Sequence, residues 1–316
     1  MNTEKVINFM GLRRIALTIS LVLVLGSIAT LFVRGLNFGL DFTGGTLVEL
    51  QYSEPPNLSE VREQLAAAGY PGAVVVHFGS ETELLVRMRA GQETDLSEGS
   101  EGASIGQNIA QALQAASPNM QIDLMRSEMI GAQMGDELAN SGGLGLLVAL
   151  IAVFIYVAIR FQTKFSVGAL VALAHDVIIV LGLFSLFQLE VDLTVLAAVL
   201  AVIGYSINDT IVVADRIREN FRVLRTDSTE EIINVSLTQT LGRTLMTSGT
   251  TLLVLLALFF VGGELIHNFS SALIVGIGVG TYSSIYVAAA IMLAMNLSKE
   301  DLMPPAKEGA ELDELP

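Results

Sequence analysis

The chain has 316 residues and contains no cysteine, which excludes disulfide bonds and metal sites built from thiolates. Its three histidines, His77, His175 and His267, lie in separate regions without the spacing of a metal-binding motif. Neither G-x-x-x-x-G-K-[ST] nor a G-x-G-x-x-G sequence after a strand occurs, and no nucleophile–base pair stands out. We therefore expect no cofactor, no bound metal, no enzymatic active site and no nucleotide hydrolysis.

Charge is scarce and mostly negative. The chain has 17 Lys and Arg against 32 Asp and Glu, a net charge of −15, and no basic stripe, so nucleic acid is not an expected partner. Charged residues make up 16% of the chain, where a soluble domain usually has about a quarter. Hydrophobic residues make up 52%. This balance indicates a membrane protein.

The apolar residues are concentrated in six runs that approach the ~20 residues needed to cross a bilayer. The runs are 15–33, 142–159, 165–187, 193–214, 245–263 and 269–293. The first has the basic start of a signal peptide, but it is longer than a signal core and more apolar residues follow its "GSIAT". We interpret it as an uncleaved first helix, and the chain as a helical membrane protein with six transmembrane helices.

The distribution of Lys and Arg predicts the orientation. They occur in the amino-terminal tail, in the links between spans two and three and between spans four and five, and in the carboxyl-terminal tail: Lys5, Arg13, Arg14, Arg160, Lys164, Arg216, Arg218, Arg222, Arg225, Lys299 and Lys307. The links 188–192 and 264–268 contain none. We therefore expect the tails 1–14 and 297–316 to be cytoplasmic and residues 34–138 to lie outside.

This outer segment has the pattern of a small α+β domain. Alternating apolar residues predict strands, helical spacing with caps predicts helices, and the elements are 46–52, 57–70, 73–78, 83–89, 104–116 and 120–126. Their order is βαββαβ, the ferredoxin-like arrangement. The stretch 90–103, rich in Gly, Ser and Glu, is predicted to be a loop.

Asp209 interrupts the apolar run of span four, where a carboxylate costs about 2.5–3.5 kcal/mol on insertion scales. Arg243 precedes the apolar part of span five and should reach a similar depth, because consecutive spans are antiparallel. One reading has Arg243 extending to lipid headgroups and Asp209 capped by Asn208 and Thr210. The other is an acid–base pair on a proton route, since burial favours a neutral carboxyl group and a nearby arginine favours an ionised one.

His175 and Asp176 form a second polar pair, in span three. They could be hydrogen-bonded to fix helix packing or belong to an ion route, and the sequence leaves both readings open. The stretches 244–252 and 276–280, "TLMTSGTTL" and "GIGVG", are interpreted as helix-packing segments.

Four motifs carry a family resemblance: "GLDFTGGT" (39–46), "AHDV" (174–177), "GYSINDTIVVADRIREN" (205–221) and "SLTQTLGRTLMTSGTTL" (236–252). Together they resemble the SecF family of bacterial protein-export membrane subunits, which is related to the resistance-nodulation-division transporters. Two residues depart from the family pattern. Ala132 stands where proline is usual and Ala214 where an aromatic residue is common.

The resemblance implies a subunit of the bacterial inner membrane that works with SecD beside the SecYEG channel. Such a subunit would use the proton-motive force to help pull exported polypeptide across, after the ATPase SecA has driven it in, and its partners would include membrane lipid. By motif, Asp209 and Arg243 match the proton relay; Asp41, Gly44 and Gly45 match the signature at the base of the outer domain. His175, Asp176, Asn208 and Thr247 are candidate supporting residues. The alternatives are a half-transporter that exports small molecules and an assembly factor that uses no protons.

Overall fold

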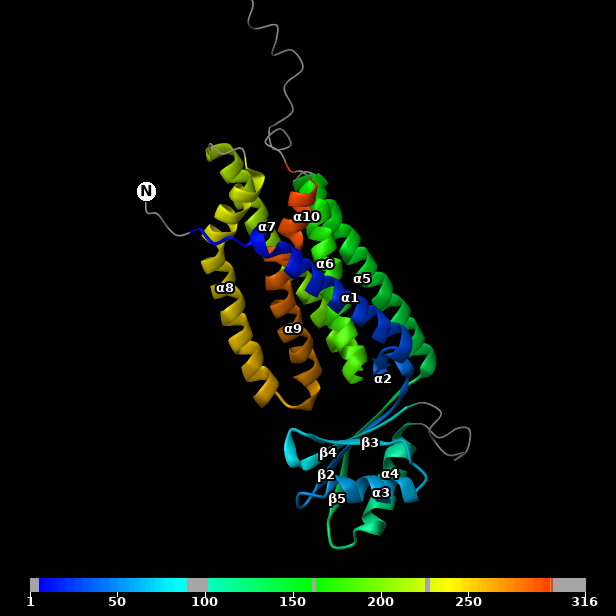
Figure 1. Cartoon of the computed structure of the whole chain (residues 1–316). Coiled ribbons are helices and arrows are strands. Elements are labelled where there is room, and N and C mark those ends of the chain that lie inside the picture. Colours follow the sequence, from blue (N-terminus) through cyan, green and yellow to red (C-terminus); the bar gives the residue numbers. More distant parts are fainter. Residues whose placement is uncertain (1–5, 90–101, 161–162, 225–227, 296, 298–316) are drawn as a thin grey trace, which may run out of the picture.

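The computed structural model describes residues 6–89, 102–160, 163–224, 228–295 and 297. It has two parts, a bundle of long helices and a smaller unit of strands and helices at one end of the bundle (Figure 1). We call the smaller unit, residues 45–130, the sheet domain. The end of the bundle beside it is the domain end, and the opposite end is the distal end.

Six helical segments of the described residues are long and apolar enough to cross a membrane. They contain α1 (Arg13–Arg34), α5 (Ala132–Arg160), α6 (Thr163–Phe187), α7 (Leu193–Val223), α8 (Thr229–Val261) and α9 (Glu264–Ser283). The last of them continues from α9 through a π-helix, η2 (Ser284–Ala288), into α10 (Ala289–Ala294). Each of the six apolar runs falls in one of these segments, except that the run 245–263 ends two residues beyond α8.

Helix α8 is longer than its apolar run because its capping residues lie outside that run. Ser228 accepts a hydrogen bond from the Glu231 backbone N–H at 3.3 Å, and Glu230 and Glu231 occupy the first turn, where acidic residues stabilise a helix. Helix α7 likewise extends to Val223, beyond its run. Both helices therefore project past the apolar zone at the distal end.

The six helices differ in how much of their surface the chain itself covers. In the most apolar windows of α6 and α9, 56% of the residues are buried, against 11% for α1, 6% for α5 and 17% for α8. Two buried clusters form the core of the bundle, one towards the distal end of α6 and α7 and the other towards their domain end. Helices α1, α5 and α8 thus present wide apolar faces to whatever surrounds the bundle.

The sheet domain contains β2 (Gly45–Tyr52), α3 (Leu58–Ala67), β3 (Val74–Phe78), β4 (Ser80–Arg89), α4 (Gly102–Ala116) and β5 (Ile122–Ile130). Its four strands are arranged in the order β3-β4-β2-β5, and each neighbouring pair is antiparallel. Alternate strand residues such as Val48 and Leu50 are fully buried with Leu65 of α3 and Ile109 of α4. The two helices therefore cover one face of the sheet.

The opposite side of the sheet meets the bundle through a short connector. Strand β1 (Asn37–Phe38) pairs in parallel with β6 (Glu190–Val191), the link between α6 and α7. Glu190 also forms an ion pair with Arg87 of β4 at 2.7 Å, and its carbonyl accepts a hydrogen bond from Asn268 of α9 at 3.1 Å. These contacts fix the sheet domain against the domain end of the bundle.

Some sequence-based expectations fall outside the described residues. Most of the predicted loop 90–103, the tail 298–316 and residues 1–5 are not described, and nothing is described of the Ala132 side chain. Ala214 is buried in the bundle core.

Candidate functional site

Asp209 lies on the buried face of α7, and its side chain is almost inaccessible, with 3% of the residue surface exposed. The face is set by helical spacing, since Val202, Ser206 and Val213 of the same helix are also buried. Ser248 of α8 donates a hydrogen bond to the Asp209 carboxylate at 3.5 Å. The Ser248 hydroxyl is also 2.8 Å from that of Thr281 on α9. Among the described residues, this long bond is the one hydrogen bond to the carboxylate.

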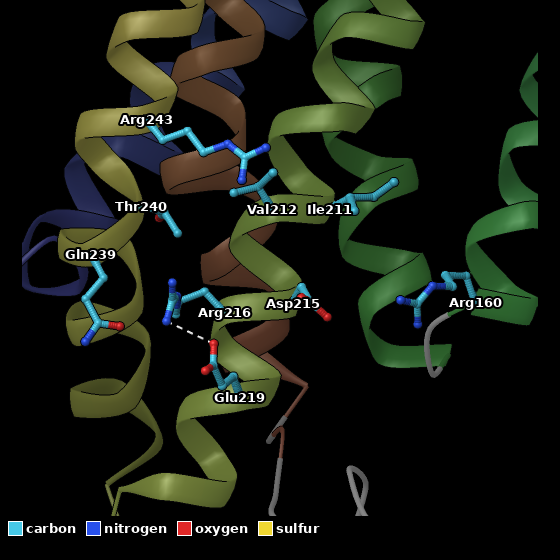
Figure 2. Close-up of a pocket in the computed structure, with 9 residues that line it drawn as sticks. All are labelled: Arg160, Ile211, Val212, Asp215, Arg216, Glu219, Gln239, Thr240 and Arg243. Carbon is cyan, nitrogen blue, oxygen red and sulfur yellow. Dashed lines mark ion pairs between the residues drawn. The ribbon is translucent and has the colours of Figure 1, made fainter.

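Arg243 lies on α8, five residues before Ser248, which places its Cα about 7.5 Å closer to the distal end. Its side chain is exposed, and Figure 2 shows the guanidinium group directed towards α7, beside Val212. The group lies within electrostatic reach of Asp209, although no ion pair joins the two within the described part of the chain. The structure thus brings both residues to the α7–α8 interface without placing them in contact.

Asp176 is fully buried on α6 and is held by three polar groups. His175 Nδ1 lies 2.9 Å from Oδ1, while Ser206 of α7 and Ser283 of α9 donate hydrogen bonds to Oδ2 at 2.6 and 2.8 Å. Gly280 permits this approach, because a Cβ there would come within 3.1 Å of the Ser206 Cβ. The cluster therefore joins three helices, the packing role that the sequence left open for this pair.

The surroundings of Asp176 and Asp209 adjoin each other. Ser206 and Asp209 are one turn apart on the same face of α7, and Thr281 and Ser283 both belong to the last turn of α9. Next to them, Thr210 is 2.9 Å from Ser284, the first residue of the π-helix, an irregularity often found at functional sites. Hydroxyl and carboxyl groups that are buried or half-buried thus gather between α6, α7, α8 and α9, where the hydroxyl groups can both donate and accept hydrogen bonds.

Two of the candidate supporting residues do not join this line. Asn208 is exposed, and Thr247 donates its hydroxyl hydrogen bond to carbonyl groups of its own helix. The Thr210 hydroxyl is hydrogen-bonded to that of Ser284, so Thr210 does not cap Asp209 as one interpretation of the sequence had it. Sequence reasoning missed five residues of this region: Ser206, Ser248, Thr281, Ser283 and Ser284. The one signal in the sequence was the i, i+3 spacing of Ser206 and Asp209, which places both on the same face of a helix.

The segment 39–46, which carries the family signature, lies at the domain end of α7. Asp41, in the short helix α2 (Leu40–Thr43), accepts a hydrogen bond from the backbone N–H of Leu193, the first residue of α7, at 3.0 Å. A carboxylate is favourable there because the helix N-terminus is partially positive. Gly44 and Gly45 have positive φ angles of 69° and 148°, a backbone conformation that favours glycine. The segment therefore links β2 of the sheet domain to the helix that carries Asp209.

The comparisons with known proteins agree along the whole chain. The family described as protein export membrane protein SecD/SecF, C-terminal, matches residues 108–298, and the SecD/SecF GG motif matches residues 29–56. Protein translocase subunit SecF of Vibrio alginolyticus is 49% identical over 318 residues, covering 100% of this chain and 99% of that protein. SecF of Pseudomonas aeruginosa is 51% identical, covering 95% and 94%. The chain belongs to the SecF family.

Solved structures show the same fold. The crystal structure of SecDF, a translocon-associated membrane protein from Thermus thermophilus, superposes with a TM-score of 0.79 at 38% identity, covering 94% of this chain. This chain spans 39% of that protein. A second SecDF structure, in a super-membrane-facing form, gives a TM-score of 0.70 at 39% identity. The chain is therefore a multi-pass inner-membrane protein and an accessory subunit of the Sec translocase.

Proposed function

We propose that the chain, together with SecD, uses the proton-motive force to assist export of polypeptides through the SecYEG channel, and that Asp209 carries the protons. One observation supports this most directly. Asp209 is buried in the middle of an apolar helix with a single long hydrogen bond among the described residues. A carboxyl group so weakly held can be neutral or ionised without disrupting a tight network, whereas Asp176, with three partners, suits a structural role.

In the proposal both termini are cytoplasmic and the sheet domain is periplasmic. The Lys and Arg asymmetry between the links supports this orientation. The strand order of the sheet domain and its element order support a ferredoxin-like domain. A compact domain held at the membrane surface by the Arg87–Glu190 pair could engage polypeptide that emerges from the channel.

Pairing with SecD is supported by the SecDF structures, in which a region like this chain is part of a longer protein. The wide exposed faces of α1, α5 and α8 also suit a partner within the membrane. The glycines of "GGLGLLVA" (142–149) are mostly exposed on α5. Gly276 and Gly280 of α9, by contrast, lie against Val202 and Ser206 of α7 and so serve packing inside the chain.

The energy available is adequate for the task. Moving one proton across the membrane yields about 2.3 kcal/mol per 100 mV, enough to shift an equilibrium between two positions of a domain that differ by a few kcal/mol. A protonated Asp209 is neutral and releases Arg243, while an ionised one attracts it. Movement of α7 would reach the sheet domain through Asp41, which binds the first residue of that helix.

The test is late-stage translocation into inverted membrane vesicles, with and without a proton gradient, after ATP has been removed. Asp209→Asn and Arg243→Met should insert and bind SecD normally yet lose the stimulation by the gradient. SecA-driven insertion of polypeptide should survive in both. Asp136→Asn, an exposed acid on α5, is the matched control and should behave as wild type. Full gradient stimulation in Asp209→Asn would leave an assembly factor as the better account.

A further inference from the structure

The distal ends of α5, α7 and α8 surround an open crevice of about 250 Å³. Its lining consists of Arg160, Ile211, Val212, Asp215, Arg216, Glu219, Gln239, Thr240 and Arg243, and Figure 2 shows these side chains. A second hollow of about 340 Å³ shares Arg160, Asp215 and Glu219 and adds Arg218 and Arg222. The two hollows form one continuous polar region, which we call the distal crevice.

The distal crevice is positively charged in a chain that is strongly negative. Among the described residues, five arginines line it against the two acids Asp215 and Glu219, an excess of three positive charges, while the whole chain carries −15. Arg216 pairs with Glu219 at 2.9 Å, but both side chains are about half exposed, and such a pair contributes little stability. The Arg216 side chain can therefore leave Glu219 and bind an anionic ligand at a small cost in free energy.

The crevice has apolar surroundings on its membrane side. Ile211 and Val212 form its inner wall, and the adjoining faces of α5 and α8 expose large apolar side chains, among them Ile159 and Met246, which are 82% and 69% exposed. Arg160 is the last residue of α5, so the crevice lies where the apolar part of the bundle ends. A ligand with a phosphate group and hydrocarbon chains would satisfy both halves of this surface.

We propose that the distal crevice binds the headgroup of an anionic phospholipid. Arginine suits this chemistry because its planar guanidinium group offers paired N–H donors to phosphate oxygens. Basic pockets between transmembrane helices commonly hold anionic headgroups in this way. The acyl chains would lie along the exposed faces of α5 and α8. The proposal concerns lipid binding and holds whether or not Asp209 carries protons.

The experiment measures binding of dioleoylphosphatidylglycerol to the purified full chain in detergent by native mass spectrometry. Replacing two arginines, Arg216→Gln with Arg218→Gln, should weaken binding about thirtyfold, since each basic residue near a membrane surface contributes roughly a fivefold gain. The double lysine variant at the same positions should keep most of the affinity. The matched control is Arg13→Gln with Arg14→Gln, two arginines at the distal end of α1, which should change binding less than twofold.

Several results would overturn the assignment. The site is not specific for anionic lipid if phosphatidylcholine binds as tightly, or if the α1 control loses as much affinity. Displacement of the lipid by an equal concentration of soluble glycerol phosphate would make it a site for free phosphate. If SecD excludes the lipid, and the double glutamine variant weakens the SecD complex, an acidic group of the partner occupies the crevice instead.

Discussion

Gly45 is the position where a single methyl group should do most damage to the sheet domain. It is the first residue of β2, between Arg89 of β4 and Ile130 of β5, and its φ of 148° suits only glycine. A Cβ there would lie 2.1 Å from the carbonyl oxygen of Met88. Backbone strain of about 1–3 kcal/mol and overpacking of about 1–3 kcal/mol together predict that Gly45→Ala lowers the stability of the sheet domain by about 3 kcal/mol.

Hydrogen–deuterium exchange of the full chain measures this loss locally. A change of about 3 kcal/mol should speed exchange of the β2 and β4 amides roughly 150-fold where exchange proceeds through opening of the domain, while the buried amides of α6 and α9 keep their protection. Gly131→Ala is the matched control, because Gly131 follows Ile130 directly and a Cβ there meets nothing within 4 Å. Wild-type exchange of β2 in Gly45→Ala would refute the steric argument.

Two further predictions concern orientation and the core of the sheet domain. The chain has no cysteine, so a single introduced cysteine is the one thiol that a reagent can label. In intact cells an impermeant thiol reagent should label a cysteine at Glu81 in β4 but not one at Val223, which is 68% exposed at the distal end. The reverse pattern would invert the proposed topology. Burial raises the pKa of Tyr52 from 10.0 to about 12. The contribution of the neutral Tyr52 side chain to the stability of the folded state is therefore complete below pH 10 and lost as the pH rises through 12. Tyr52→Phe should thus gain stability relative to wild type above pH 10, measured by circular dichroism, and an unchanged difference between pH 8 and pH 11 would contradict this.

Much of the architecture could be predicted from local patterns. The six apolar runs mark the six helices because crossing a bilayer needs about 20 apolar residues whatever the tertiary structure. The start of α8 also has a local signal, Ser228 and the acidic residues after it, since capping acts within one turn. The order of strands and helices in the sheet domain followed from the change between two-residue and helical periodicity. In each case the information lies within a few residues of the element.

The contacts of the site depend on how the helices turn relative to one another, which local patterns do not specify. Asn208 and Asp209 are adjacent and both polar, yet Asn208 is exposed and Asp209 is buried, because neighbouring residues point about 100° apart around a helix. Ser248 resembles the other small polar residues of its stretch until α8 is placed against α7. The offset of Arg243 from Asp209 likewise depends on the relative heights of the two helices.

The glycines of α9 show the same limit. A stretch of small residues indicates a close helix approach but does not identify the neighbour. Gly276 would place a Cβ 2.1 Å from a Val202 side-chain atom, so this glycine serves packing within the chain. Only the three-dimensional arrangement separates that use from a contact with a second protein.

The central claim is that protons cross the membrane by way of Asp209, and proton flux tests it most directly. The chain and SecD, reconstituted together in liposomes that contain a pH-sensitive dye, should carry protons when a membrane potential is imposed. Asp209→Asn should reduce this flux to that of protein-free liposomes, because an amide cannot take up and release a proton, whereas Asp209→Glu should retain part of it. A flux in Asp209→Asn equal to that of wild type would contradict the account.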